Sequence, residues 1–378
     1  MSKPLALIAS DLHLKPKTWR HRPIVGDSYY AWEQIQEEAI QCGVGFVILA
    51  GDLLDRQING SEPIIKLQQG IEKLGENGIK TLFIQGQHEY QEFPWASLSA
   101  HAHHLAADGV EIGPFWVEGI DYQSKETFRR ALEECSEMGD QDILVMHQVW
   151  LDWMGERALP QGSFQHVRDL APSLKTLITG DLHESRLEWY DNKSLQLLSP
   201  GSTCMQSVAE PLQKYMYYLS EGDDGLPEFE RVELKSRPFV RWEKKLETSE
   251  DVDDVVGKIE DEFARVFDYA DANKLPEEIC TPIFHFTYSH EVADEVRRIE
   301  KLLDDRAHLF WKEMPAVVED KAHMETLEMG VSATMADMLR EEVDDEKVRN
   351  LSERLLASPD IFEELVRWQK EQLTNESS

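Results

Sequence analysis

The fold is decided by the stretch Phe46-Val47-Ile48-Leu49-Ala50-Gly51-Asp52-Leu53-Leu54-Asp55-Arg56. Its first five residues form an uninterrupted apolar run that stops at a glycine, which predicts a short strand buried on both faces of a sheet. Asp52 would then lie at the C-terminal end of this strand, the edge at which open α/β sheets carry their functional groups. The stretch therefore predicts an α/β fold that presents a carboxylate at a sheet edge.

Four further apolar runs end in the same way, each followed by side chains that can bind a metal. Five buried strands that deliver Asp, His or an amide to one edge indicate a metal centre rather than core packing alone. The runs and the groups that follow them are residues 5–9 with Asp11 and His13, residues 81–84 with Gln87, His88 and Glu89, residues 143–146 with His147, and residues 174–179 with Asp181 and His183.

Carboxylate, imidazole and amide donors without a thiolate suit Mn²⁺, Fe²⁺, Zn²⁺ or Mg²⁺. Two such cations a few ångströms apart can clamp a phosphate and activate a water molecule. We expect Asp52 to bridge the two cations and His88, which is not needed as a ligand, to act on the phosphate in the transition state. The remaining ligands divide into Asp11, His13 and His183 for one cation and Gln87, His147 and Asp181 for the other.

Composition limits the class of protein. The 378 residues allow two or three domains, and no apolar run approaches the roughly 20 residues of a membrane span. Together with an N-terminus that lacks the apolar segment of a signal peptide, this predicts a soluble, cytoplasmic protein. The four cysteines form no Cys-x-x-Cys pair, which argues against a disulfide framework and a zinc–thiolate site. With 72 acidic and 39 basic residues the net charge is −33, which should repel nucleic acid except where basic residues are concentrated.

The order of the elements predicts three segments. Residues 1–243 carry buried runs, crossover helices and then short alternating strands, a pattern typical of a mixed β-sandwich layered with helices. Residues 244–317 follow an αβαβ pattern that begins at a helix capped by Thr248 or Ser249, and predict a small separate domain. Residues 318–378 are highly charged and are predicted to be helical. A helix is also predicted over residues 95–105, with His101, His103 and His104 on a solvated face.

The five metal-binding motifs resemble those of one known superfamily. Asp-x-His, Gly-Asp-x-x-Asp-Arg, Gly-Asn-His-Asp/Glu, a single His and Gly-His-x-His are the signatures of calcineurin-like metallophosphoesterases. The corresponding motifs here begin at Asp11, Gly51, Gly86, His147 and Gly180. Within that superfamily the chain resembles the SbcD-like nuclease subunit of double-strand-break repair. The likeness includes the His-Gln pair at 147–148, the Ser-Pro-Gly-Ser turn at 199–202 and a closing strand of the first domain at 237–240.

This resemblance implies a fold, an activity and partners. The fold would be a four-layer α/β/β/α sandwich with a DNA-capping domain at 244–317 and a helical segment at 318–378 that binds an SbcC-like coiled-coil ATPase. The activity would be a DNA exonuclease and endonuclease of repair and recombination that uses two Mn²⁺ ions, with Mg²⁺ possible, in a homodimer. The chain has no Gly-x-x-x-x-Gly-Lys-Ser/Thr loop, so any use of ATP would come from the partner.

Two expected ligands depart from the superfamily pattern. Gln87 stands where Asn is usual, and Asp181 stands where the first His of Gly-His-x-His is usual. Gln places its carbonyl oxygen one methylene further out, and an anionic Asp favours Mn²⁺ or Mg²⁺ over metals that prefer imidazole. Two alternatives therefore stay open: a catalytically weakened scaffold subunit, and a phosphodiesterase or phosphatase that acts on substrates other than DNA.

A basic patch follows the first two ligands, Asp11 and His13. It consists of Lys15, Lys17, Arg20 and Arg22, with Trp19 among them. The patch can be an ordinary surface loop, or it can contact DNA phosphates while Trp19 stacks on a base.

Three further residues lie next to the predicted ligands in the sequence. Asp55, Arg56 and Glu89 are expected to support the ligands without touching the metal.

Overall fold

The computed structural model describes residues 3–18, 24–57, 60–137, 141–155, 158–303 and 306–314. The chain divides into two compact units, residues 1–313 and 314–378, and the elements below belong to the first of them or end at its border. The predicted helical segment at 318–378 lies outside the described residues. So do three members of the basic patch, Trp19, Arg20 and Arg22.

The first sheet contains the strand that leads to Asp52. Four strands of this sheet, the strand before Asp52 among them, run parallel, so their carboxyl ends meet at one edge. The other two form an antiparallel hairpin that pairs with the first strand of the chain. In spatial order the strands are β12 (Pro227–Leu234), β11 (Lys214–Glu221), β1 (Ala6–Ala9), β2 (Phe46–Ala50), β3 (Lys80–Ile84) and β4 (Ala102–His104).

The second sheet brings in the remaining predicted ligands. Its central strands are also parallel, and His147 at the end of one strand lies opposite Gly180 at the end of the next. The order is β5 (Val110–Ile112), β6 (Phe115–Ile120), β7 (Ile143–His147), β8 (Thr176–Gly180), β10 (Leu195–Ser199) and β9 (Arg186–Tyr190). All five predicted ligand-bearing strands are thereby confirmed.

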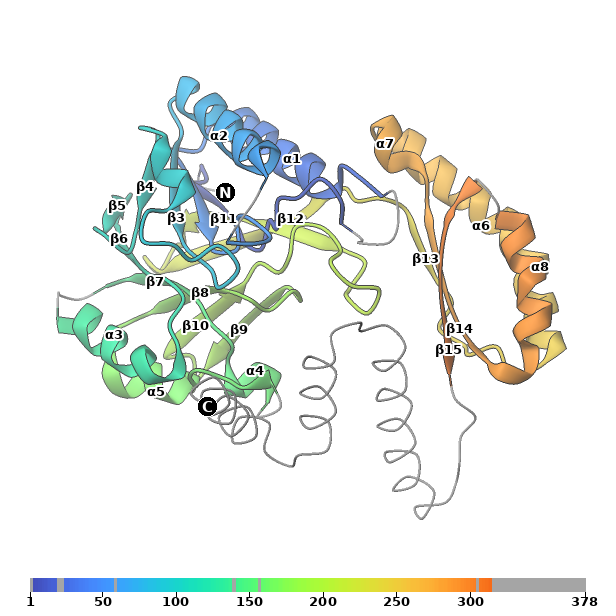
Figure 1. Ribbon diagram of the computed structural model, residues 1–378. Helices are drawn as coiled ribbons and strands as arrows, with labels where there is room; N and C mark the ends of the chain where they lie inside the picture. The colour runs from blue at the N-terminus through green and yellow to red at the C-terminus, as the bar shows by residue number, and fades with distance from the viewer. Residues whose placement is uncertain are drawn as a thin grey trace, which may run out of the picture. The chain divides into compact units, whose positions relative to one another are not determined.

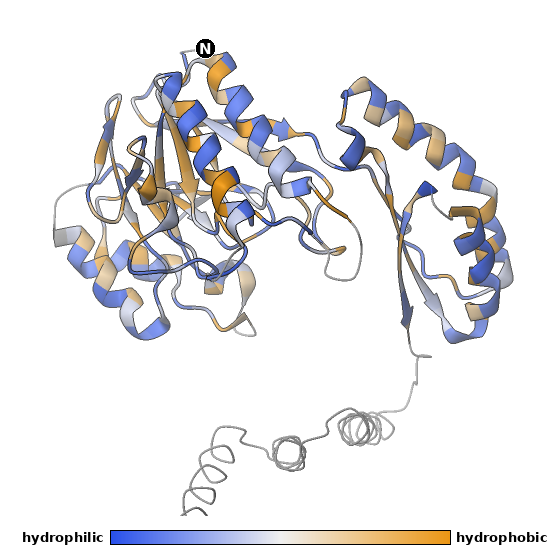
Figure 2. Ribbon diagram, turned by 45° about the horizontal axis from the view of Figure 1, so that its top comes forward, coloured by the Kyte–Doolittle hydropathy of each residue, from blue (hydrophilic) through white to orange (hydrophobic). Residues whose placement is uncertain are grey.

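Helices cover the outer face of each sheet (Figure 1). The helices α1 (Asp27–Cys42) and α2 (Ser61–Glu76) pack on the first sheet, and α3 (Lys125–Glu137) and α5 (Phe164–Leu170) pack on the second. A buried cluster that includes Ile8, Ile48, Val145 and Ile178 fills the space between the two sheets. The predicted four-layer α/β/β/α sandwich is confirmed, and Figure 2 shows its hydrophobic strands flanked by helices with hydrophilic outer faces.

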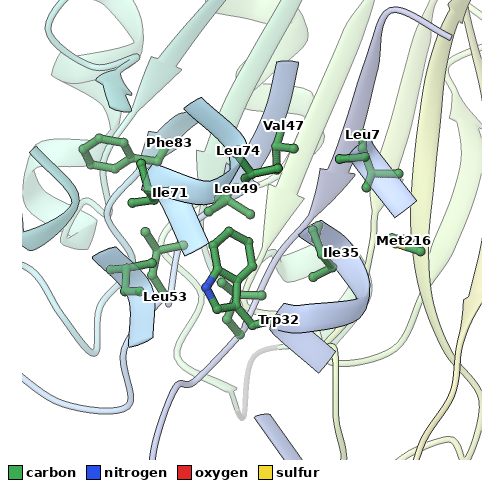
Figure 3. Packing of buried hydrophobic residues seen from close by; sticks show 14 of the residues in the cluster. Leu7, Trp32, Ile35, Val47, Leu49, Leu53, Ile71, Leu74, Phe83 and Met216 are labelled. Carbon is green, nitrogen blue, oxygen red and sulfur yellow. The ribbon is translucent and has the colours of Figure 1, made fainter. Parts of the chain in front are cut away.

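Trp32 of α1 is the largest side chain in the core beneath the first helical layer, and it is 1% exposed. Figure 3 shows it among Ile35 of its own helix, Leu49 of β2 and Leu74 of α2. Burial of a large apolar side chain contributes about 1.5–3 kcal/mol. This packing fixes the strands whose ends carry the candidate ligands.

A third sheet follows the sandwich. It contains β13 (Phe239–Arg241), β14 (Ile283–Ser289) and β15 (His308–Met314), and it packs with α6 (Ser249–Ala272) and α8 (Ala293–Leu303) around one core. The short helix α7 (Glu277–Cys280) precedes β14. We call these six elements the αβ module.

Two local predictions are wrong. The expected closing strand of the sandwich is β13, which pairs in parallel with β14 and so belongs to the αβ module. The expected helix over residues 95–105 is instead a 3₁₀ turn, η1 (Trp95–Leu98), followed by β4. β4 extends the edge of the first sheet, and its pairing with β3 outweighs the local helical tendency. His104 stacks on Phe83 at 4.9 Å and lies 2.8 Å from Asp121, so it does not lie on a solvated helix face.

The short helix α4 (Leu151–Met154) and the helix α5 were not predicted, nor was strand β5. α5 has only seven residues, too few to show a clear apolar stripe in the sequence. Its N-terminus carries a capping box between Ser163 and His166. None of these elements carries a predicted ligand.

Candidate metal centre

The carboxyl ends of β1, β2, β7 and β8 bring the predicted ligands into one cluster. Four of these residues adopt a left-handed backbone conformation that non-glycine residues rarely take: Asp11 (φ 51°), His13 (φ 43°), Asp52 (φ 51°) and Asp181 (φ 78°). Such a conformation costs on the order of 1–3 kcal/mol each and tends to occur where a functional geometry requires it. The recurrence of this conformation at four candidate ligands indicates a functional site.

His147 is held between two glycines. A Cβ atom at Gly51 would lie 2.5 Å from His147 Nδ1, and one at Gly180 would lie 2.4 Å from the same atom. The Nδ1–H group donates to the Ala50 carbonyl oxygen at 2.9 Å, which directs Nε2 toward the cluster. His147 Nε2 is fully buried and has no hydrogen-bond partner. An unpartnered buried ring nitrogen aimed at carboxylates is what a metal ligand requires.

Donor atoms surround Asp52. Its Oδ2 lies 3.3 Å from His147 Nε2, 3.6 Å from His13 Nε2 and 3.8 Å from His88 Nε2. Ligands that share a cation at about 2.1 Å lie roughly 3–4 Å apart, so these spacings suit a carboxylate with a cation on each side. Asp52 therefore lies at the centre of the cluster.

Asp11 is the second carboxylate at the centre. Its Oδ1 lies 3.8 Å from His183 Nε2, 3.9 Å from His13 Nε2 and 4.0 Å from His147 Nε2. Both Asp11 oxygens accept from the Asp181 backbone N–H, at 3.2 and 3.3 Å. Asp11 therefore also joins the loops that follow β1 and β8.

His13 and His183 face each other with their Nε2 atoms 3.2 Å apart. His183 Nδ1 donates to Glu210 Oε1 at 2.8 Å, so its Nε2 lone pair points into the cluster. Glu210 in turn accepts from the buried Lys214 ammonium at 2.7 Å and from Ser202 Oγ at 3.1 Å. Glu210 and Lys214 were not predicted from the sequence, because neither belongs to a motif and Glu210 lies 27 residues beyond His183.

His88 lies at the exposed side of the cluster, with 44% of its side chain accessible. Its backbone N–H donates to Asp52 Oδ1 at 3.0 Å, and its Nδ1 lies 3.0 Å from the Asp55 carbonyl oxygen. The Nε2 atom is left to face the cluster and the solvent. This placement suits a group that touches a bound phosphate, and it also places His88 within ligand distance of His13 and Asp52.

Gln87 and Asp181, the two departures from the superfamily pattern, contact each other. Gln87 Nε2 donates to Asp181 Oδ1 at 2.6 Å. Asp181 Oδ1 also lies 3.9 Å from His147 Nε2. The amide and the carboxylate predicted for one cation are therefore joined directly to each other.

The predicted supporting residues tie the loops together. Glu89 accepts from the Leu54 backbone N–H at 2.6 Å and from that of Gly86 at 3.3 Å, which links the loops after β2 and β3. Asp55 accepts from Lys15 Nζ at 2.6 Å and lies 3.4 Å from Arg56 Nε. The charge of Lys15 is therefore directed at Asp55 beside the cluster, whereas Lys17 is exposed.

Burial and mutual charge shift the pKa values in this cluster. Burial raises the pKa of Asp11 to about 6 and lowers that of His13 to about 3, so His13 is neutral at pH 7. Burial alone would raise the pKa of Asp52, but the charge and hydrogen bond of His147, with smaller contributions from the other histidines, together outweigh burial and hold this pKa below its usual range. Burial, together with the charge of Asp52, raises the pKa of Glu89 to about 8.

The residues present fit a divalent-metal centre. Three sets of candidate ligand atoms each lie within 4.8 Å of one another, and they share members: Asp11, His13 and His183; His13, Asp52 and His88; and Asp11, Asp52 and His147. The unpartnered Nε2 of His147 and the carboxylates facing it satisfy the chemistry of such a site. In the described part of the chain the four cysteines are free and none belongs to these sets.

Residues 5–169 match the family model of the calcineurin-like phosphoesterases. The matched segment includes six of the eight residues predicted to act at the metal centre, from Asp11 to His147. The geometry above supplies a candidate dimetal site, most of whose residues lie in this matched segment. No helix in the part of the chain that the structure describes is both long and apolar enough to cross a membrane.

Several solved structures are similar to part of this chain at low sequence identity. The protein TT1561 of Thermus thermophilus is 13% identical with a TM-score of 0.43, covering 62% of this chain and 100% of its own. A dimetal phosphatase from Danio rerio is 13% identical with a TM-score of 0.38, covering 61% and 100%. Vps29 from Entamoeba histolytica, complexed with zinc, is 17% identical with a TM-score of 0.32, covering 61% and 99%. No curated protein matches the chain.

Proposed function

We propose that this protein is a DNA nuclease that hydrolyses phosphodiester bonds in the processing of DNA ends, with two Mn²⁺ ions or alternatively Mg²⁺. The observation that carries the hydrolytic part is the buried pair Asp11 and Asp52 encircled by four imidazoles whose Nε2 atoms face them. The DNA substrate, the coiled-coil ATPase partner and the homodimer rest on the sequence resemblance to SbcD-like nucleases.

Each part of the cluster has a role in this proposal. Divalent cations, when bound, would supply Lewis acidity at the phosphate and lower the pKa of water. Asp11, His13, Asp52 and His183 would hold one cation, and Asp52, His147, Gln87 and Asp181 the other. His88, with its backbone anchored to Asp52 and its Nε2 exposed, would donate a hydrogen bond or proton to the departing oxygen.

A weakened scaffold subunit is the second candidate function. The observation that favours it is the hydrogen bond between Gln87 and Asp181, because a group engaged in this bond is less available to a cation. A scaffold would still bind DNA and the ATPase but would show little turnover with either cation.

The decisive experiment combines His88→Ala with assays on several substrates. We expect this variant to lose hydrolysis of DNA by roughly 10²–10⁴-fold, the typical contribution of a positioned acid or base, while Mn²⁺ affinity measured by calorimetry stays unchanged. His101→Ala is the matched control, because its side chain is 43% exposed and belongs to none of the ligand sets in the described residues.

Four outcomes would contradict parts of the proposal. Full activity in the His88 variant would remove His88 from the mechanism, and a large loss of Mn²⁺ affinity would make it a ligand. Faster turnover of a nucleotide monoester than of DNA would favour a phosphatase or phosphodiesterase that acts on small molecules. Wild-type protein that binds DNA without hydrolysing it, in Mn²⁺ or Mg²⁺, would favour the scaffold.

A further inference from the structure

Glu210 occupies an unusual position in the loop between β10 and β11. Its carboxylate accepts hydrogen bonds from His183 Nδ1, Lys214 Nζ, Ser202 Oγ and the Gln206 backbone N–H, at 2.7–3.1 Å. Both carboxylate oxygens are therefore engaged, and the side chain can hardly rotate. Through a single hydrogen bond this fixed group determines the tautomer and the ring orientation of His183.

Burial of Lys214, the cation that binds Glu210, costs free energy of desolvation. Lys214, the first residue of β11, is 2% exposed, and its ammonium contacts Glu210 and Ser202. A buried ion pair commonly contributes little net stability, because the desolvation of two charges offsets their attraction. We therefore expect this ion pair to serve mainly in fixing the orientation of the Glu210 carboxylate.

The same loop is held from the αβ module. Arg241, the last residue of β13, donates through Nη2 to the carbonyl oxygens of Val208 and Glu210, at 2.5 and 2.6 Å. Its own backbone is fixed by parallel pairing with His285 of β14. The backbone of Glu210 is thus attached to the sheet of the αβ module, while its side chain is attached to a candidate metal ligand.

A second arginine ties the start of the module to the sandwich. Arg237 is 6% exposed and pairs with Asp27 of α1 at 2.9 Å. It also donates to the carbonyl oxygens of Glu278 and Thr281, which lie just before β14. The start of β13 is therefore anchored to the sandwich by Arg237. A movement of the rest of the αβ module would displace Arg241 and, through it, the loop that carries Glu210.

We propose that Glu210 is a positioning residue for His183 and that Arg241 makes this positioning depend on the αβ module. A module held in place keeps the Nε2 lone pair of His183 directed at the cation shared with Asp11 and His13. Displacement of Val208 and Glu210 would release the ring and weaken the binding of that cation. A macromolecule that binds to the module could in this way change the occupancy of the metal centre. The inference rests on the metal centre of the proposed function and not on its substrate.

The experiment compares Glu210→Gln and Arg241→Met with the unmodified full-length chain. We expect Glu210→Gln to weaken the Mn²⁺ site that contains His183 by about 10–100-fold in calorimetry, the usual effect of losing an acceptor behind a metal-binding histidine. Arg241→Met keeps Glu210, Lys214 and Ser202 intact and should weaken the same site by a smaller factor. Long-range ¹H–¹⁵N spectra should show His183 shift from the Nδ1–H tautomer toward a mixture in both variants.

Matched controls separate positioning from general damage. Glu118→Gln alters a buried carboxylate on β6 whose partner is the Cys135 thiol, and Arg231→Met removes an arginine that stacks on Tyr215. Neither residue contacts the candidate ligands, so Mn²⁺ affinity and the His183 signals should stay unchanged. His183→Ala provides the final test, because adding Glu210→Gln to it should cost no further Mn²⁺ affinity.

Several results would overturn the inference. Unchanged affinity and tautomer in Glu210→Gln would show that the carboxylate does not position His183. An additive loss in the double variant would mean that Glu210 acts through general stability. Unchanged Mn²⁺ affinity and an unchanged His183 tautomer in Arg241→Met would show that the αβ module does not influence the metal centre. Because these readouts concern metal binding, they remain informative even if DNA is not the substrate.

Discussion

At the scale of single residues, the centre departs from the calcineurin-like motifs that it resembles at two positions that contact each other. The sequence has Gln87 and Asp181 where the motifs that it resembles have Asn and His, and we predict that both serve one cation. The structure adds the hydrogen bond of 2.6 Å between them. A cation that used the Gln87 oxygen and the Asp181 carboxylate would compete with this bond.

We therefore predict two unequal Mn²⁺ sites. Breaking a hydrogen bond to a charged group costs about 1.5–3 kcal/mol, which corresponds to roughly 10–150-fold in affinity. Calorimetry on the unmodified protein should resolve a tight site and a weaker one. The double replacement Gln87→Asn with Asp181→His should tighten the weaker site and leave the other within a factor of about two.

The single variants provide the control for this prediction. Each should recover only part of the affinity, because each removes one member of the hydrogen-bonded pair without restoring the other ligand. Two tight and equivalent sites in the unmodified protein would refute the argument.

At the scale of elements, the buried apolar strands could be predicted from the sequence, whereas a strand at the edge of a sheet could not. The strand at Phe46–Ala50 has the predicted bounds, since five apolar residues bounded by glycine leave few alternatives. The strand at Ala102–His104 was missed because its polar residues become a strand only by pairing with β3. Glu210 was missed for a similar reason: its role depends on a contact across 27 residues and on no local pattern.

The segment from residue 318 to 378 carries a second prediction from the sequence. Ile361, Leu365 and Trp368 follow the i, i+4, i+7 spacing of an amphipathic helix that begins at Ser358-Pro359. We expect this apolar stripe to dock onto the base of a coiled-coil ATPase. Deletion of residues 318–378 should abolish co-purification with the ATPase while Mn²⁺ affinity and the thermal unfolding of the sandwich are retained.

A triple replacement of these three residues by Ser is the finer variant, because it keeps the length and net charge of the segment. Retained association in both variants would show that the stripe packs within this chain and that the ATPase binds elsewhere.

At the scale of the whole molecule, the charge of −33 sets the problem of binding a polyanion. Each phosphate contact needs a cation, and DNA should be rejected wherever acidic groups dominate the surface. Of the four cations in the basic patch, Lys15 is engaged by Asp55 beside the metal centre. Contact with DNA would therefore fall chiefly on Lys17, Arg20 and Arg22, so the test should replace these three and treat Lys15 separately.

We predict that Lys17, Arg20 and Arg22 replaced together by Ser will weaken DNA binding strongly and flatten its dependence on salt. If all three contact phosphates, the slope of log K against log salt should fall by about 3, since each contact releases about one counterion. The measurement is DNA affinity over a salt series. Hydrolysis of a small aryl phosphodiester, which needs the metal centre alone, should be unchanged. A matched control replaces Arg129, Arg130 and Lys175 of the sandwich by Ser, because these exposed residues form ion pairs outside the expected DNA-capping domain and their loss changes the net charge equally. If both triple variants reduce the slope alike, general charge and not the basic patch governs binding, and if neither does, DNA is held by another surface or by the ATPase.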